Sequence, residues 1–256
     1  MSYQGKVAVV TGGGTGIGKA IAAKLGSQGA SVAICGRRQE PLEEAVAEMK
    51  EQGIRAWQSA CDVSDREDVD RFFQQAAEEL GPAWCLVNNA GSSGVTKVSQ
   101  PDYERWDTII RANVDSLYYA TSAALRTMPD EGRIISLSSI LGKFGVPGYT
   151  AYCTSKHAVV GFTRAVSLEL APRKITVNAL CPGWVETEMA REGLSIGARA
   201  SKTDYETYRK MAIDQVPLKE MIVPEEVADL AAYLVSPAAR NITGQSINIC
   251  GGQVMH

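Results

Sequence analysis

The sequence predicts an α/β fold in which one doubly wound parallel sheet of about seven strands carries helices on both faces. Short runs rich in Val, Ile and Leu alternate with longer segments of helical period, the pattern of strand–helix–strand crossovers. No repeat, low-complexity tract or Pro/Gly/Ser-rich linker divides the chain, so 1–256 is expected to form one domain. The strands are expected at Val7–Val10, Ser31–Cys35, Arg55–Ser59, Cys85–Val87, Arg133–Leu137, Thr176–Leu180 and Ser246–Ile249.

Helices are expected between these strands, where apolar residues recur every three or four positions. Their predicted ranges are Gly16–Gln28, Glu40–Glu51, Arg66–Glu79, Tyr103–Met128, Tyr152–Leu170 and Pro224–Leu234. The segment 184–219 departs from this rhythm, because strand signals are absent and Gly193 and Gly197 interrupt it. We interpret the segment as a substrate-covering lid with a short helix around Tyr205–Met211; the alternative is a solvated surface excursion.

Composition excludes several classes of partner. The 26 Lys and Arg and 29 Asp and Glu give a net charge of −3 without a basic run, which argues against nucleic acid. The six cysteines form no Cys-x-x-Cys pair and only two histidines accompany them, so neither a metal site nor a disulfide framework is expected. With no apolar run of about 18 residues and no secretory pattern, we expect no membrane association and a cytoplasmic location.

A glycine-rich turn, TGGGTGIG, follows the first strand and opens the first helix. Glycine permits positive φ and close backbone approach, so amides and the positive end of the helix can face a pyrophosphate. This placement indicates a Rossmann-type dinucleotide site, although a turn that serves only tight packing has the same letters. The candidate binding residues are Gly12, Thr15, Gly16, Ile17 and Gly18.

The second strand ends in Gly36, Arg37 and Arg38, where an NAD-binding chain places a carboxylate for the ribose hydroxyls. No acid is present there, and two guanidinium groups can clamp a ribose phosphate instead. NADP(H) is therefore favoured over NAD(H), while two ordinary surface arginines remain the alternative.

Tyr152 and Lys156 are one helical turn apart and therefore share a face. A nearby ammonium stabilises phenolate, so we expect Lys156 to lower the pKa of Tyr152 and to make it an acid and base for a substrate oxygen. A chance aromatic–lysine pair is the alternative.

Together these motifs resemble the short-chain dehydrogenase/reductase family from Lys6 to Gly252. The matching elements are Thr11–Gly18, Asp62, Asn88–Gly91, Asn113, Ser139, Tyr152 with Lys156, Pro182–Gly183 and Thr187. The resemblance implies that Tyr152 is the acid and base, that Lys156 holds the nicotinamide ribose, and that Ser139 orients the carbonyl. It also implies that Asn113 completes a catalytic tetrad by holding a water near the lysine; an asparagine bonded to backbone is the alternative.

The same resemblance implies three groups of residues around the dinucleotide. They are Asp62 and Val63 beside the adenine, Asn89, Ala90 and Gly91 beside the adenosine ribose, and Pro182, Gly183, Val185 and Thr187 around the nicotinamide.

On the family's layout the substrate faces predominantly apolar residues, which favours a hydrophobic ketone or alcohol. The candidates are Val95, Ser139, Ile140, Leu141, Phe144, Tyr149, Tyr152, Trp184 and Met189. The chain resembles 3-oxoacyl carrier-protein reductases and, through VNALCPGWVET, aromatic polyketide ketoreductases. Arg173 and Lys174 fit the basic residues with which carrier-protein reductases meet an acidic carrier, but Asp130 and Glu131 at the other expected position oppose docking. The chain also departs from the polyketide ketoreductases, because Ser92–Gly94 replaces their usual Pro-Gly-Gly.

The predicted function is NADPH-dependent reduction of a ketone or 3-oxoacyl group to a secondary alcohol. A catabolic NAD-dependent secondary-alcohol dehydrogenase is the alternative, and a noncatalytic dinucleotide-binding protein is a third. The partners expected are a small-molecule carbonyl or alcohol and, as is common in the family, further copies of the chain in a homotetramer or dimer.

Overall fold

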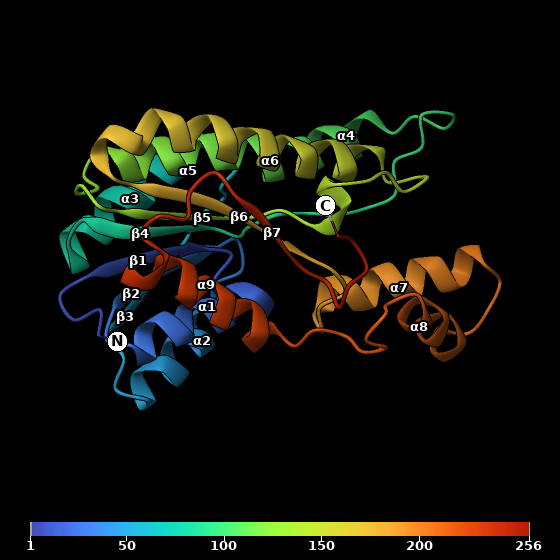
Figure 1. Ribbon diagram of the computed structural model, residues 1–256, viewed down its shortest axis with the longest axis horizontal. Helices are drawn as coiled ribbons and strands as arrows, with labels where there is room; N and C mark the ends of the chain where they lie inside the picture. The colour runs from blue at the N-terminus through green and yellow to red at the C-terminus, as the bar shows by residue number, and fades with distance from the viewer. Residues whose placement is uncertain (1, 256) are drawn as a thin grey trace.

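Seven parallel strands form one sheet in the computed structural model, which describes residues 2–255 (Figure 1). The strands are β1 (Val7–Thr11), β2 (Ser31–Gly36), β3 (Ala56–Ala60), β4 (Ala83–Asn88), β5 (Arg133–Leu137), β6 (Thr176–Pro182) and β7 (Ser246–Ile249). Their order is β3-β2-β1-β4-β5-β6-β7, so the winding direction reverses between β1 and β4. The predicted doubly wound parallel sheet is confirmed, and this reversal opens a crevice at the carboxyl ends of the strands.

Helices cover both faces of the sheet (Figure 1). One layer holds α1 (Gly16–Ser27), α2 (Gln39–Glu51) and α9 (Pro224–Val235), and the other holds α3 (Arg66–Leu80), α5 (Ser116–Leu125) and α6 (Thr150–Leu170). Successive residues of β1 point to opposite faces, as strand geometry requires. Ala8 and Val10 pack in the core beneath α1 and α9, whereas Val7 and Val9 pack beneath α3 and α5.

The prediction of one helix over Tyr103–Met128 is wrong. The segment divides into α4 (Tyr103–Ile110), a π-helical turn η1 (Arg111–Asp115) and α5, which ends at Leu125. The Asn113 side chain, in the π turn, is hydrogen-bonded to Ser92 and Ser155 from distant parts of the chain. A periodicity of 3.6 residues carries no signal for a turn that tertiary contacts stabilise.

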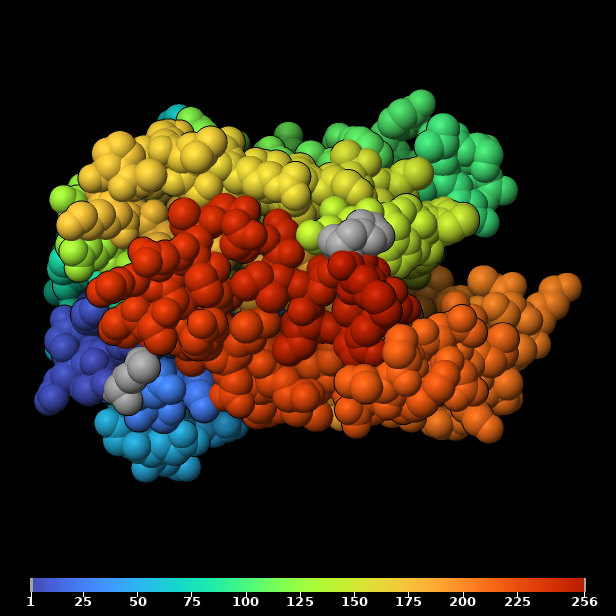
Figure 2. Space-filling view, viewed as in Figure 1, coloured from blue at the N-terminus to red at the C-terminus, as the bar shows by residue number. Residues whose placement is uncertain are grey.

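The segment 184–219 contains two helices where one short helix was predicted: α7 (Glu188–Ala200), which the prediction missed, and α8 (Tyr205–Asp214). Glycines interrupted the helical pattern, but Gly197 has a packing role, because a Cβ there would collide with the ring of Tyr208 on α8. Figure 2 shows the two helices as an orange lobe, separated by an indentation from the green segment that leads into α4.

Short 3₁₀ turns complete the secondary structure: η2 (Ile140–Gly142), η3 (Ala171–Arg173) and η4 (Pro237–Ala239). Among residues 2–255, no helix combines the length and apolarity that crossing a bilayer requires. All six cysteines are free and buried, and the described residues contain no His/Cys/Asp/Glu group arranged to hold a metal.

Candidate active site

Tyr152, Ser139 and Lys156 converge at the carboxyl end of β5. Ser139 follows this strand, and Tyr152 and Lys156 lie on the first two turns of α6. Burial raises the pKa of Tyr152 to about 12, and a hydrogen bond with the Ser139 side chain opposes that rise. The phenol therefore carries its proton at neutral pH, beside a hydroxyl that can bind the same substrate oxygen.

Lys156 is buried, with its Nζ 5.6 Å from the centroid of the Tyr152 ring and donating to the Leu137 carbonyl at 2.7 Å. Burial lowers the pKa of its ammonium to about 8. The predicted net fall in the pKa of Tyr152 is wrong for this structure, because desolvation of the buried phenol raises that pKa.

Asn113 is buried next to this pair, and its amide is fully engaged. Its Oδ1 accepts from the Ser92 amide at 2.7 Å, and its Nδ2 donates to the Ser92 carbonyl and to Ser155 Oγ, each at 2.9 Å. A Cβ on Gly91 would lie 2.9 Å from Asn113 Oδ1 and 3.7 Å from Lys156 Nζ. Asn113 thus fixes the strand-to-helix loop beside Lys156. Its two bonds to the Ser92 backbone are those expected if Asn113 is an asparagine bonded to backbone, the alternative to a residue that holds a water.

The buried ammonium predicts a pH-dependent stability. The pKa of Lys156 is about 8 in the folded chain and 10.5 ordinarily, so between these values the unfolded state binds more protons. The free energy of unfolding therefore rises with pH across this window. Below pH 8 the buried Lys156 is charged in the folded chain, and the full cost of burying that charge lowers the stability. We expect Lys156→Met to gain stability relative to wild type most at pH 7, the gap narrowing by up to roughly 3 kcal/mol by pH 10.

Urea unfolding of both proteins at several pH values measures this gap, with Lys50→Met, on an exposed part of α2, controlling for the loss of a lysine. A gap that stays constant from pH 7 to pH 10 would show that the ammonium is not desolvated.

A cavity of about 900 Å³ opens where the sheet order reverses. Its lining includes Gly12, Gly14, Thr15, Gly36, Arg37, Arg38, Asp62, Val63, Ala90 and Gly91. Gly12 has φ +65°, and a Cβ there would lie 3.0 Å from the Ala90 backbone. The turn therefore requires glycine and presents the amino end of α1 to the cavity. The volume and the backbone cradle fit a dinucleotide, and Arg37 and Arg38 lie together at the end of β2, where they can bind a phosphate.

Some of the residues predicted to bind the dinucleotide line the cavity, and others hold the lining residues in place. Asn89 supports the glycine turn, because its Nδ2 donates to the Thr11 and Gly12 carbonyls at 2.9 and 3.0 Å. Asp62 is held by Ser64, whose amide and hydroxyl donate to its Oδ1 at 3.0 and 2.7 Å. Ile17 is partly buried against the core of the α1 layer.

The segment after β6 lies on the other side of the glycine turn. The Gly183 amide donates to the Ile249 carbonyl at 2.9 Å, which fixes Pro182 and Gly183 beside β7. Val185 is buried and bridges to Ile222. A Cβ on Gly16 would lie 3.2 Å from Thr187 Cγ2, so the start of α7 is in contact with the turn.

The expected substrate side combines α6, η2 and the lobe. Tyr149 is half-buried, and burial together with Tyr208 and Glu192 raises its pKa. A Cβ on Gly193 of α7 would lie 3.7 Å from the Trp184 ring. These electrostatic and packing interactions bring residues of 184–219 next to the amino end of α6.

Ile140 is buried against the carboxyl-terminal segment, a contact that sequence reasoning missed. It clusters with Cys250 and Val254, and Leu141 and Phe144 pack on that cluster. The Gly251–Gly252 pair is the feature of the sequence that could have predicted this contact. With φ values of +58° and +87°, the two glycines turn the chain back after β7.

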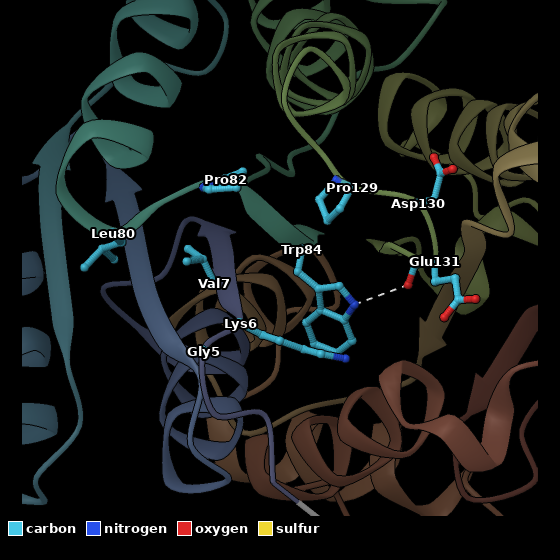
Figure 3. A pocket seen from close by; sticks show the side chains of 9 residues that line it. All are labelled: Gly5, Lys6, Val7, Leu80, Pro82, Trp84, Pro129, Asp130 and Glu131. Carbon is cyan, nitrogen blue, oxygen red and sulfur yellow. Dashed lines mark hydrogen bonds between the residues drawn. The ribbon is translucent and has the colours of Figure 1, made fainter.

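A second pocket, of about 350 Å³, lies at the amino ends of β1, β4 and β5, opposite Tyr152. Figure 3 shows Lys6 along the face of Trp84, with its Nζ 4.0 Å from the ring centroid. The Trp84 indole donates to the Glu131 carbonyl at 3.2 Å. Lys6, Asp130 and Glu131 line this pocket together with apolar side chains.

Comparisons with known proteins agree with this geometry. A family model described as short chain dehydrogenase matches residues 6–195. A putative ketoacyl reductase of Streptomyces coelicolor is 38% identical, with 96% of each chain covered. D-beta-hydroxybutyrate dehydrogenase of Cupriavidus necator is 36% identical, with 98% of each covered. The crystal structure of a variant actinorhodin polyketide ketoreductase with NADPH superposes with a TM-score of 0.95 at 37% identity, covering 99% of each chain.

The family match extends over most of the chain, and the curated relatives cover nearly all of it at more than 30% identity. It includes the glycine turn, the serine and the tyrosine–lysine pair that the fold brings to one edge of the sheet. The chain therefore belongs to the short-chain dehydrogenase family and is an oxidoreductase with a Rossmann-type fold.

Proposed function

We propose that the protein reduces a ketone or 3-oxoacyl group of a hydrophobic substrate to a secondary alcohol, with NADPH as reductant. The observation that carries this proposal is a protonated Tyr152 phenol hydrogen-bonded to Ser139, beside a cleft that fits a dinucleotide. With a pKa near 12 the phenol carries its proton at neutral pH, which is the protonation state from which it can act as the acid in carbonyl reduction.

The cofactor, when bound, supplies the hydride for the carbonyl carbon. Ser139 donates a hydrogen bond that orients the carbonyl oxygen, and Tyr152 gives its proton to that oxygen as the alcohol forms. Lys156 then stabilises the tyrosinate until a proton returns from solvent. Asn113 positions the loop beside Lys156 through its bonds to Ser92 and Ser155.

The proposed NADPH-binding residues are those around the cleft. The glycine turn would hold the pyrophosphate, Asp62 and Val63 would border the adenine, and Thr187 and Val185 would bind the carboxamide. Arg37 is exposed at the cavity rim, and its side chain forms no ion pair or hydrogen bond within the described residues 2–255. The Arg37 guanidinium is therefore available to a ribose phosphate.

Arg37→Ala is expected to weaken NADPH binding about tenfold or more, because a charge-assisted hydrogen bond contributes about 1.5–3 kcal/mol. NADH binding should stay within about twofold, because NADH lacks the phosphate. Fluorescence titration of both nucleotides, followed by turnover of hydrophobic ketones, tests the proposal. A preference for NADH that the substitution leaves unchanged would instead support NAD-dependent alcohol oxidation.

A free carbonyl compound or small thioester suits this chain better than a carrier-bound substrate. Arg173 Nε lies 3.0 Å from Asp130 Oδ1, and Lys174 Nζ lies 4.0 Å from Glu131 Oε1. The basic residues expected to meet an acidic carrier are thus paired within the chain, which reduces their attraction for it.

Assembly into a homotetramer or dimer stays a prediction of the family resemblance. Among the apolar side chains of α5 and α6, Leu117 and Val159 are buried inside the chain, whereas Tyr118 is 63% exposed and Leu168 is 79% exposed. Sedimentation of the purified chain tests the oligomeric state.

A further inference from the structure

An ion pair joins the lobe to the rim of the dinucleotide cleft. Arg38 Nη2 lies 3.5 Å from Glu188 Oε2, and the two side chains are 63% and 79% exposed. Arg38 precedes α2 and lines the cavity, whereas Glu188 is the first residue of α7.

The ion pair spans the glycine turn. A Cβ on Gly14 would lie 3.2 Å from the Pro41 backbone of α2, and a Cβ on Gly16 would lie 3.2 Å from Thr187 Cγ2. The turn is thus in contact with α2 on one side and with the residue before α7 on the other. Arg38 and Glu188 extend from these two sides.

The two arginines at the end of β2 are therefore in different states. Arg37 has no carboxylate within ion-pair distance among the described residues, whereas Arg38 is paired through Nη2 with one oxygen of Glu188. A phosphate and a carboxylate bind the same face of a guanidinium fork, so they compete for it. The Glu188 charge also opposes the approach of a dianion to this rim.

We propose that Glu188 weakens the binding of NADPH, and not of NADH, by competing with the 2′-phosphate for Arg38. This inference rests on the proposed use of NADP(H). It adds a residue of the lobe to the cofactor site, so occupation of that site by a 2′-phosphate loosens the contact between α2 and α7.

Glu188→Gln is expected to tighten NADPH binding about two- to fivefold at low ionic strength, the range that exposed ion pairs allow. NADH binding should be unchanged, and added salt should shrink the NADPH effect because exposed charges are screened. Asp229→Asn is the matched control: it removes one exposed acidic charge from the Lys24–Asp229 pair on α1 and α9 and should leave both affinities unchanged.

The same substitution in an Arg38→Gln background separates competition from simple repulsion. If Glu188 acts through Arg38, Glu188→Gln has no effect on NADPH affinity once Arg38 is absent. The inference is overturned if the effect persists in that background, if Glu188→Gln leaves NADPH affinity unchanged, or if it weakens NADPH and NADH equally. Thermal unfolding of each variant confirms that the chain remains folded.

Calorimetry with adenosine 2′,5′-bisphosphate and AMP distinguishes this inference from the proposed cofactor. Tighter binding of the bisphosphate by wild type supports NADP(H), and a further gain in Glu188→Gln supports the competition. Equal binding of the two nucleotides by wild type overturns the cofactor proposal and the inference with it. Preference for the bisphosphate without a gain in the variant overturns the inference alone.

Discussion

Tyr152→Phe is expected to reduce the rate of ketone reduction by a factor of about 10²–10⁴, the range that general acid catalysis contributes. The substitution removes the phenolic proton that the hydrogen bond with Ser139 orients. The ring and its contacts remain, so NADPH affinity and the unfolding temperature should stay close to wild type. Single-turnover reduction under saturating NADPH measures the loss directly.

Tyr233→Phe is the matched control for Tyr152→Phe. It removes the same hydroxyl from an exposed tyrosine on α9, remote from the carboxyl ends of the strands, and should leave turnover unchanged. Full turnover by Tyr152→Phe would exclude the phenol as the proton donor.

Gly18→Ala is expected to lower both stability and NADPH affinity. A Cβ at Gly18 would collide with the Gly12 carbonyl and with Asn89 Nδ2, which fix the glycine turn. Alanine gains about 1 kcal/mol in helix propensity over glycine, but overpacking costs about 1–3 kcal/mol and the turn must move. Affinity should fall about fivefold to a hundredfold, as measured by titration.

Gly161→Ala is the matched control for Gly18→Ala, because it adds the same methyl group to a helix without a collision. Gly161 is an exposed helical glycine of α6 with no atom within 4 Å of its would-be Cβ. At this position nothing opposes the higher helix propensity of alanine. The free energy of unfolding should therefore rise by about 0.5–1 kcal/mol, and NADPH affinity should not change. NADPH binding by Gly18→Ala at wild-type strength would show that the turn tolerates displacement.

The sequence determined the layers of the fold and the positions of the strands. Alternation in Val7–Val10 has a local cause, because each residue of a strand faces one side or the other, and the helical segments repeat their apolar faces in the same way. The placement of the glycine turn between strand and helix is also local. The Tyr152–Lys156 spacing on one helical face followed from the period alone.

Tertiary structure decided the protonation states and the contacts across the cleft. Spacing predicted that Lys156 would lower the pKa of Tyr152, but only the folded chain shows that burial dominates both groups. The π turn at Asn113 and the helical packing at Gly197 depend on partners distant in the chain. So does the Arg38–Glu188 pair. Desolvation and long-range contacts depend on residues that are distant in the sequence and adjacent only in the folded chain. Local sequence patterns therefore do not predict them.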